Sequence, residues 1–160
     1  MAHIADLMTS WGSFYANHAA ARTLVAFAHV GALIAGGGIA IAADRSTLNA
    51  LHQGATIRRL QLEALHGTHR IVIASLALIA ASGLLLFASD FETFLYSRFF
   101  WIKITFVALL VVNGAVLWRA ERRAIRGDEA AWGTLRFSAV ASIALWLLTT
   151  LGGVALPNIG

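Results

Sequence analysis

The apolar residues of this chain are gathered in four long blocks that are separated by shorter polar stretches. The blocks cover residues 23–43, 71–88, 99–118 and 137–156. Each is close to the ~20 residues that a helix needs to cross a ~30 Å hydrocarbon layer. Short connections between successive crossings favour an antiparallel, up-and-down arrangement. The pattern therefore predicts an all-α fold, an integral membrane antiparallel four-helix bundle that forms a single domain.

The polar stretches refine the bounds of the predicted helices. Residues 46–69 mix apolar and polar positions without a proline, which indicates helix that continues beyond the membrane. The turn before the last block holds Gly127 and Asp128, residue types that suit a cap for the last helix. We expect the helices at residues 20–45, 58–89, 98–122 and 131–157, with a short aromatic loop at 89–97.

The first residues differ from the four blocks. His3, Asp6 and His18 interrupt this segment, so a cleavable signal peptide is not expected. Its aromatic side chains are of the types that favour the headgroup region of a membrane. We expect residues 1–17 to form a short interfacial segment on the outer surface.

Composition and charge narrow the functional classes. Hydrophobic residues make up 59% of the chain and charged residues 12%, so lipid is expected to be its main solvent. The absence of cysteine excludes disulfides, thiolate metal sites and iron–sulfur clusters. The net charge of +4 does not indicate a nucleic-acid partner, because the arginines flank the membrane blocks. They concentrate in the first and third loops: Arg45, Arg58, Arg59, Arg70, Arg119, Arg122, Arg123 and Arg126.

This distribution predicts an orientation in the membrane. The positive-inside rule places the first and third loops in the cytoplasm. We therefore expect a multi-pass protein of the bacterial cytoplasmic (inner) membrane, with both termini on the periplasmic side.

Ionisable residues inside the apolar blocks are the candidates for function, because burying one at membrane depth costs ~3 kcal/mol or more. His29 lies in the first block and Lys103 in the third. Both blocks are entered from the same side, so the two side chains are expected at one level. Lys103 either reaches out to the headgroups or supplies a cation to an anionic group of a cofactor or substrate. Arg136 and Asn113 are candidates to pair with Asp44 or with lipid phosphate.

Small residues follow His29 at a spacing of four, at Ala32, Gly36 and Ala40. Such a stripe lets two helices approach closely. Alternatively, it leaves space for a flat cofactor, since Gly36 is almost two full turns after His29 and lies on the same face.

His66 and His69 are three residues apart and so share a helix face. They are either ligands for haem or a metal, or a solvated pair at the membrane edge. A single iron shared between His29 and His69 is not expected, because the two lie ~20 Å apart along the membrane normal.

The order of these residues resembles two families of small bacterial membrane proteins, the HemJ-type protoporphyrinogen oxidases and the CopD-like copper-resistance domains. The resemblance rests on His29 with its following glycines, on Asp44 and Arg45 at the helix exit, and on the aromatic-then-lysine start of residues 99–103. It covers about residues 24–118. The chain departs from both families at Gly36, where they usually carry tryptophan, and it contains only two methionines.

The resemblance implies a b-type haem on His29, near Lys103. In this picture His29 is an axial ligand, Gly36 lies beside the haem, and Lys103 with Arg45 or Arg98 pairs with acid groups of the haem or a substrate. His29 and, from their spacing, His66 and His69 are the candidate metal ligands, and no catalytic residue is assigned. The second axial ligand is left open: His66 or His69 after a register shift, a histidine of a second protomer, or none.

The function we expect is electron transfer or a small membrane oxidoreductase activity, with haem b as the cofactor. Membrane lipids surround the protein, and a homodimer, a larger membrane complex, quinone or a redox protein are the partners considered. Two alternatives stay open. One is a haem-free transporter of a metal or small solute, and the other is a non-catalytic subunit of a membrane complex.

Overall fold

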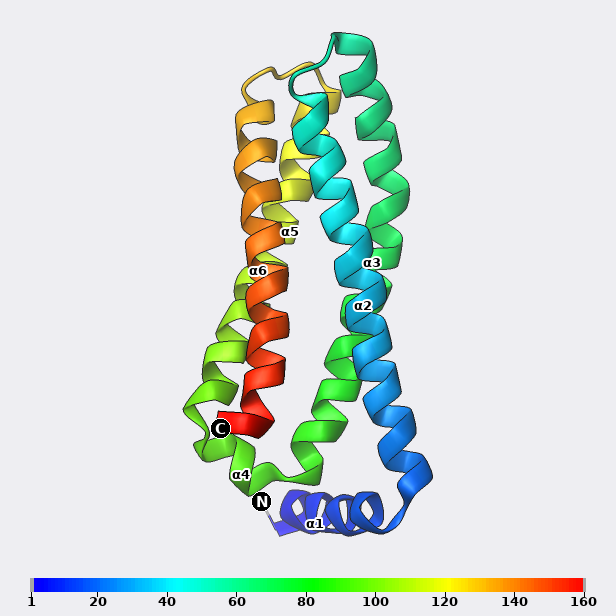
Figure 1. The fold of residues 1–160 in the computed structure, drawn as a ribbon, viewed down its shortest axis with the longest axis vertical. Helices are drawn as coiled ribbons and strands as arrows, with labels where there is room; N and C mark the ends of the chain where they lie inside the picture. Colours follow the sequence, from blue (N-terminus) through cyan, green and yellow to red (C-terminus); the bar gives the residue numbers. More distant parts are fainter. Residues whose placement is uncertain (1, 160) are drawn as a thin grey trace.

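The protein is a bundle of long helices. The computed structural model describes residues 2–159, which form six helices and no strand (Figure 1). Four of them are long and apolar enough to cross a membrane: α2 (Ala19–Ala50), α3 (Ala55–Ser89), α5 (Arg98–Ile125) and α6 (Ala131–Ile159). The predicted all-α helical bundle is confirmed, and it is compatible with a multi-pass membrane protein.

The long helices form two hairpins, α2–α3 and α5–α6. The turns of both hairpins, residues 51–54 and 126–130, lie at one end of the bundle, which we call the loop end (Figure 1). The termini and the two shorter helices lie at the other end, which we call the terminal end. The hairpins contact each other through α2 and α6, whereas α3 and α5 barely touch. The basic first and third loops therefore lie at the same end of the molecule.

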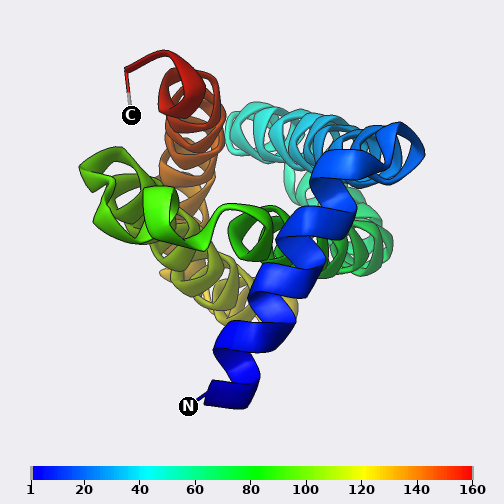
Figure 2. The same cartoon turned by 90° about the horizontal axis from the view of Figure 1, so that it is seen from below.

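Helix α1 (Ala2–Asn17) crosses the terminal end of the bundle (Figure 2). The indole Nε1 of Trp11 donates a hydrogen bond of 2.8 Å to the carbonyl oxygen of Leu85 on α3. The neighbouring Gly12 lies against α3 as well, since a Cβ at this position would come within 3.1 Å of the Ser89 carbonyl oxygen. The segment expected at the membrane surface is thus a helix anchored to the end of α3.

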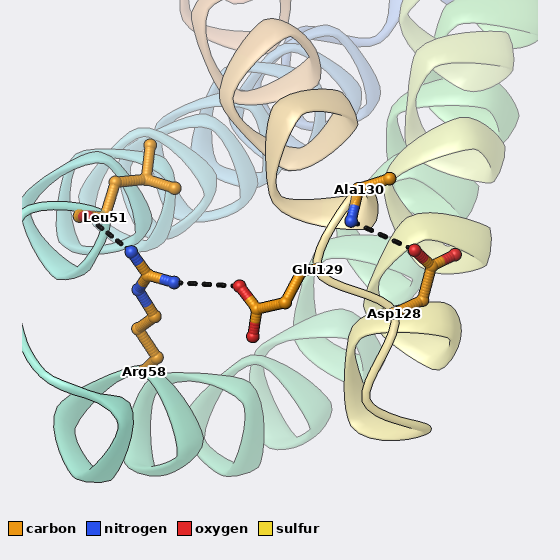
Figure 3. A network of polar contacts seen from close by, with 5 residues as sticks. All are labelled: Leu51, Arg58, Asp128, Glu129 and Ala130. Carbon is orange, nitrogen blue, oxygen red and sulfur yellow. Dashed lines mark hydrogen bonds and ion pairs between the residues drawn. The ribbon is translucent and has the colours of Figure 1, made fainter.

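A network of polar contacts joins the two hairpins at the loop end (Figure 3). Arg58 of α3 forms an ion pair of 3.2 Å with Glu129 and donates a hydrogen bond of 3.0 Å to the Leu51 carbonyl oxygen. Its guanidinium group also lies 5.3 Å from the ring centre of Trp132 on α6. One arginine thereby links the α2–α3 turn, the α5–α6 turn and the start of α6.

The α5–α6 turn contains both residues expected to cap the last helix, and their contacts shape the turn just before α6. The carboxylate of Asp128 accepts a hydrogen bond of 3.0 Å from the Ala130 amide (Figure 3). Gly127 has a φ of 87°, a left-handed conformation that side chains disfavour. The hydrogen bond from Arg123 holds the pKa of Asp128 below its ordinary value.

Burial is concentrated toward the loop end. From the terminal end, the first buried residue of α2 is Ala32 and that of α5 is Leu110, while burial ends at Ser82 on α3 and at Thr149 on α6. In the part of the chain that the structure describes, the segments beyond these residues contain no buried residue. The helices diverge in this region (Figure 1). We call it the terminal half, and the packed remainder the loop half.

Several helix bounds differ from the expected ones. Helix α2 continues to Ala50 rather than ending at residue 45, because no glycine or proline lies between residue 45 and Gly54. For the same reason α3 begins at Ala55, directly after Gly54. The expected loop at 89–97 contains the short helix α4 (Phe91–Tyr96), which was not predicted from the sequence.

Candidate functional site

His29 lies in the terminal half, where α2 faces α3. Its ring nitrogen Nδ1 is 2.9 Å from the hydroxyl oxygen of Ser82. The ring also lies over Gly83, where an added Cβ would come within 3.3 Å of the His29 Cε1 atom. Because Gly83 has no side chain, the imidazole of His29 can lie close to the backbone of α3.

The hydrogen bonds of Ser82 indicate the tautomer of His29. The Ser82 hydroxyl has a single hydrogen, and its oxygen lies 2.6 Å from the Leu78 carbonyl oxygen and 3.2 Å from that of Ile79. Donation to either carbonyl leaves the Ser82 oxygen to accept from His29, which favours a proton on Nδ1. Nε2 then has a lone pair available to an iron, a metal ion or a proton.

Lys103 lies on α5 at the same level as His29, as the depth argument predicts. The two side chains are close enough for their charges to interact. The stem of Lys103 packs on α6 at two glycines: an added Cβ on Gly152 would lie 3.6 Å from the lysine Cβ, and one on Gly153 would lie 3.5 Å from Nζ. One turn deeper on α6, the buried hydroxyl of Thr149 has no hydrogen-bond partner among the described residues.

Gly36 belongs to a tight helix contact. A Cβ at Gly36 would lie 2.5 Å from the Ser75 Cβ on α3, and one at Gly37 would lie 3.0 Å from the ring of Trp146 on α6. Helix packing therefore accounts for these glycines. Ser75 and Trp146 occupy the space beside them, where a flat cofactor was the alternative expectation.

The other residues of the predicted cofactor and metal set lie elsewhere. Arg45 is exposed near the loop end, and its position on α2 is 16 residues from His29, or ~24 Å of helix. The α2–α3 register pairs His29 with Ser82 and Gly36 with Ser75. That register carries His69 ~20 Å from His29 along the bundle, so the structure does not bring the two together.

A second group of ionisable side chains is buried in the loop half. Asp44 of α2 is 2% exposed, and the Ser142 hydroxyl of α6 hydrogen-bonds its carboxylate. His69 of α3 has its Nδ1 atom 3.1 Å from Oε2 of Glu121 on α5, an ion-pair distance without hydrogen-bond geometry. His66 is exposed one turn nearer the loop end. Four helices thus contribute to one polar layer.

Asp44 was expected at a helix exit, yet it is buried beside α6. The pairing considered for Asp44 is not found, because the Asn113 amide nitrogen donates a hydrogen bond of 2.9 Å to the Ser138 carbonyl oxygen and Arg136 is exposed. One signal was present: the stripe at Ala32, Gly36 and Ala40 continues at the same spacing to Asp44. The residue at the end of a buried stripe is itself expected to be buried.

Among the described residues, no three histidine, aspartate or glutamate side chains are placed to hold a metal ion together. Metal ligation by His66 and His69 therefore gains no support. Compared with known protein families, curated proteins and solved structures, the chain matches none. The resemblance to the HemJ-type and CopD-like families stays a prediction.

Proposed function

We propose that the protein binds a b-type haem through His29 and acts in electron transfer or as a small oxidoreductase in the membrane. The observation that carries this proposal is the 2.9 Å contact between Nδ1 of His29 and the Ser82 hydroxyl, which leaves Nε2 as the ring nitrogen for a ligand. Histidines that ligate a metal commonly donate their other ring N–H to a protein acceptor, which orients the ring and raises its basicity. The Ser82 hydroxyl oxygen would be this acceptor for His29.

The surroundings of His29 suit such a cofactor in two respects. The terminal half contains no buried residue among those described, so it is the least closely packed part of the bundle. Lys103 supplies a cation at the level of His29 for the propionate groups. When bound, a haem supplies one-electron chemistry, and the chain holds it, orients His29 and excludes water.

His69 lies beside Glu121 in the loop half, so it does not serve as the second axial ligand. A histidine of a second copy of the chain fills the position, or it stays open for a small ligand. A homodimer, a larger membrane complex, quinone and a redox protein are therefore the partners to test.

The proposed location is the bacterial cytoplasmic membrane. The positive-inside rule places the arginine-rich loop end in the cytoplasm and both termini on the periplasmic side. Arg58, Arg59, Arg122 and Arg123 lie at the loop end, which supports this orientation. His29 and Lys103 are then nearer the periplasmic side.

The test is the visible spectrum of the purified protein in detergent, oxidised and then reduced with dithionite. We expect a Soret band and a sharp reduced α-band that are lost or altered in His29→Ala. The matched control is His52→Ala, which removes an exposed histidine in the α2–α3 turn and should leave the spectrum unchanged. A wild-type protein that stays colourless after haem supplementation would contradict the proposal and favour a haem-free transporter or a structural subunit.

A further inference from the structure

The loop half contains a buried carboxylate that the proposed haem site does not use. Asp44 is 2% exposed, and Ser142 hydrogen-bonds its carboxylate. Its second oxygen, Oδ2, is fully buried and has no hydrogen-bond partner among the described residues. An ionised carboxylate in this position would lack a partner for much of its charge, which is costly away from water. The unpartnered oxygen Oδ2 would therefore be stabilised by a hydrogen-bond donor or by a proton.

A cavity of about 60 Å³ adjoins Asp44. Its lining includes one or more residues of each long helix, and the polar ones are Asp44, Thr68, His69, Asn113 and Ser142. A water molecule takes about 30 Å³, so the cavity has room for one or two. The hydroxyl of Thr68 and the amide of Asn113 already have protein partners. Water in the cavity thus finds its free polar atoms at Asp44 and His69.

His69 lines the cavity and is also partly exposed at the surface of the protein. Toward the loop end, the side chain of His69 is 20% exposed, and the exposed His66 lies one turn beyond it. His66 also interacts electrostatically with His69 and with Glu121. Toward the terminal end, Trp146 is 3% exposed and packs closely against Gly37, which closes the cavity on that side.

We propose that Asp44 is a proton-binding site that exchanges protons through water in this cavity with the His69–Glu121 pair, and so with the loop end. A proton entering at His69 passes to a cavity water, which delivers one of its own protons to Oδ2 of Asp44. The carboxylate becomes a neutral carboxyl group and the imidazole returns to its neutral form. No electron is transferred, and the proposal does not depend on haem.

The groups around Asp44 favour a proton over a metal ion. Hard cations take six or more oxygen ligands, whereas the cavity offers one unpartnered carboxylate oxygen in a mostly apolar lining. The cavity brings His69 of α3 to the same lining as Asp44, and His69 in turn lies beside His66 and Glu121. On α6 it faces the neutral Ser142, and Arg45, its neighbour on α2, is exposed.

The first test is infrared spectroscopy of the full-length protein in lipid as the pH is lowered from neutral toward about 5. Exposed carboxylates, with an ordinary pKa of about 4, are ionised there and give no carboxylic-acid C=O band. We expect a band from protonated Asp44 that shifts in deuterated water and disappears in Asp44→Asn. The control Asp90→Asn, which changes an exposed aspartate at the start of α4, should retain it. An unchanged band in Asp44→Asn would overturn the assignment.

Two further variants test the surroundings and guard against misfolding of Asp44→Asn. Ser142→Ala removes the hydrogen bond to the carboxyl group and should shift the frequency of the band. His69→Phe keeps a ring but removes the exchangeable group, and it should slow deuterium exchange of the band several-fold. An unshifted band in Ser142→Ala, or an exchange rate unaffected by His69→Phe, would refute the proton connection. Circular dichroism verifies that each variant is folded.

Discussion

The close contact between Gly36 and Ser75 should make the substitution Gly36→Ala destabilising. A Cβ at Gly36 lies 2.5 Å from the Ser75 Cβ, whereas contacting carbons prefer about 3.5–4.0 Å. Gly36→Ala must therefore push α2 and α3 apart by roughly 1 Å. Overpacking of this kind costs about 1–3 kcal/mol. Alanine also gains about 1 kcal/mol of helix propensity over glycine, which offsets part of that cost.

Gly38 provides the matched control on the same helix. Nothing lies within 4 Å of a Cβ at Gly38, so Gly38→Ala should gain the helix propensity of alanine without any overpacking. The two variants should differ by about 1–3 kcal/mol in free energy of unfolding, with Gly36→Ala the less stable. Reversible unfolding in mixed detergent micelles, followed by circular dichroism, measures this difference. Ser75→Gly should rescue Gly36→Ala in a double-mutant cycle. Equal stabilities of the two alanine variants, or no coupling to Ser75, would refute the close contact.

Three other substitutions should have distinct effects. Gly127→Ala forces a side chain into a left-handed conformation and should lower the free energy of unfolding by about 1–2 kcal/mol in the same assay; no loss would refute the turn geometry. Asp128 has a depressed pKa, so its contribution to stability is present above the unfolded pKa of about 3.9 and is lost as pH falls through the folded value. Asp128→Asn should accordingly lose less melting temperature on acidification than the wild type, and equal losses would contradict this. Ser82→Ala should weaken haem binding about 10–100-fold and raise its midpoint potential, because His29 loses the acceptor for its Nδ1 proton; unchanged titrations would count against the role of Ser82.

The four apolar blocks were sufficient to predict the helical bundle, because membrane-crossing helices must satisfy their own backbone hydrogen bonds and so depend little on distant residues. The shared level of His29 and Lys103 also follows from counting residues along helices that enter from the same end. The turn at Gly127 and Asp128 is local and was predictable for the same reason.

The loop-half layer was harder to predict, because it depends on where four helices continue and which faces meet. Asp44 and Glu121 look like exit residues in the sequence, yet α2 and α5 extend past them and neighbouring helices cover them. The partner of Gly36 is likewise non-local: only the register of α2 against α3 shows that Ser75 meets it. The hydrogen bond from His29 to Ser82 depends on that same register.

The most direct test of the proposed function is the amount of haem bound per chain in the purified wild-type protein and in His29→Ala. Near-stoichiometric haem in the wild type, and almost none in a folded His29→Ala variant, is the predicted result. A wild type without haem after supplementation, or equal haem content in the two proteins, would contradict a haem held by His29.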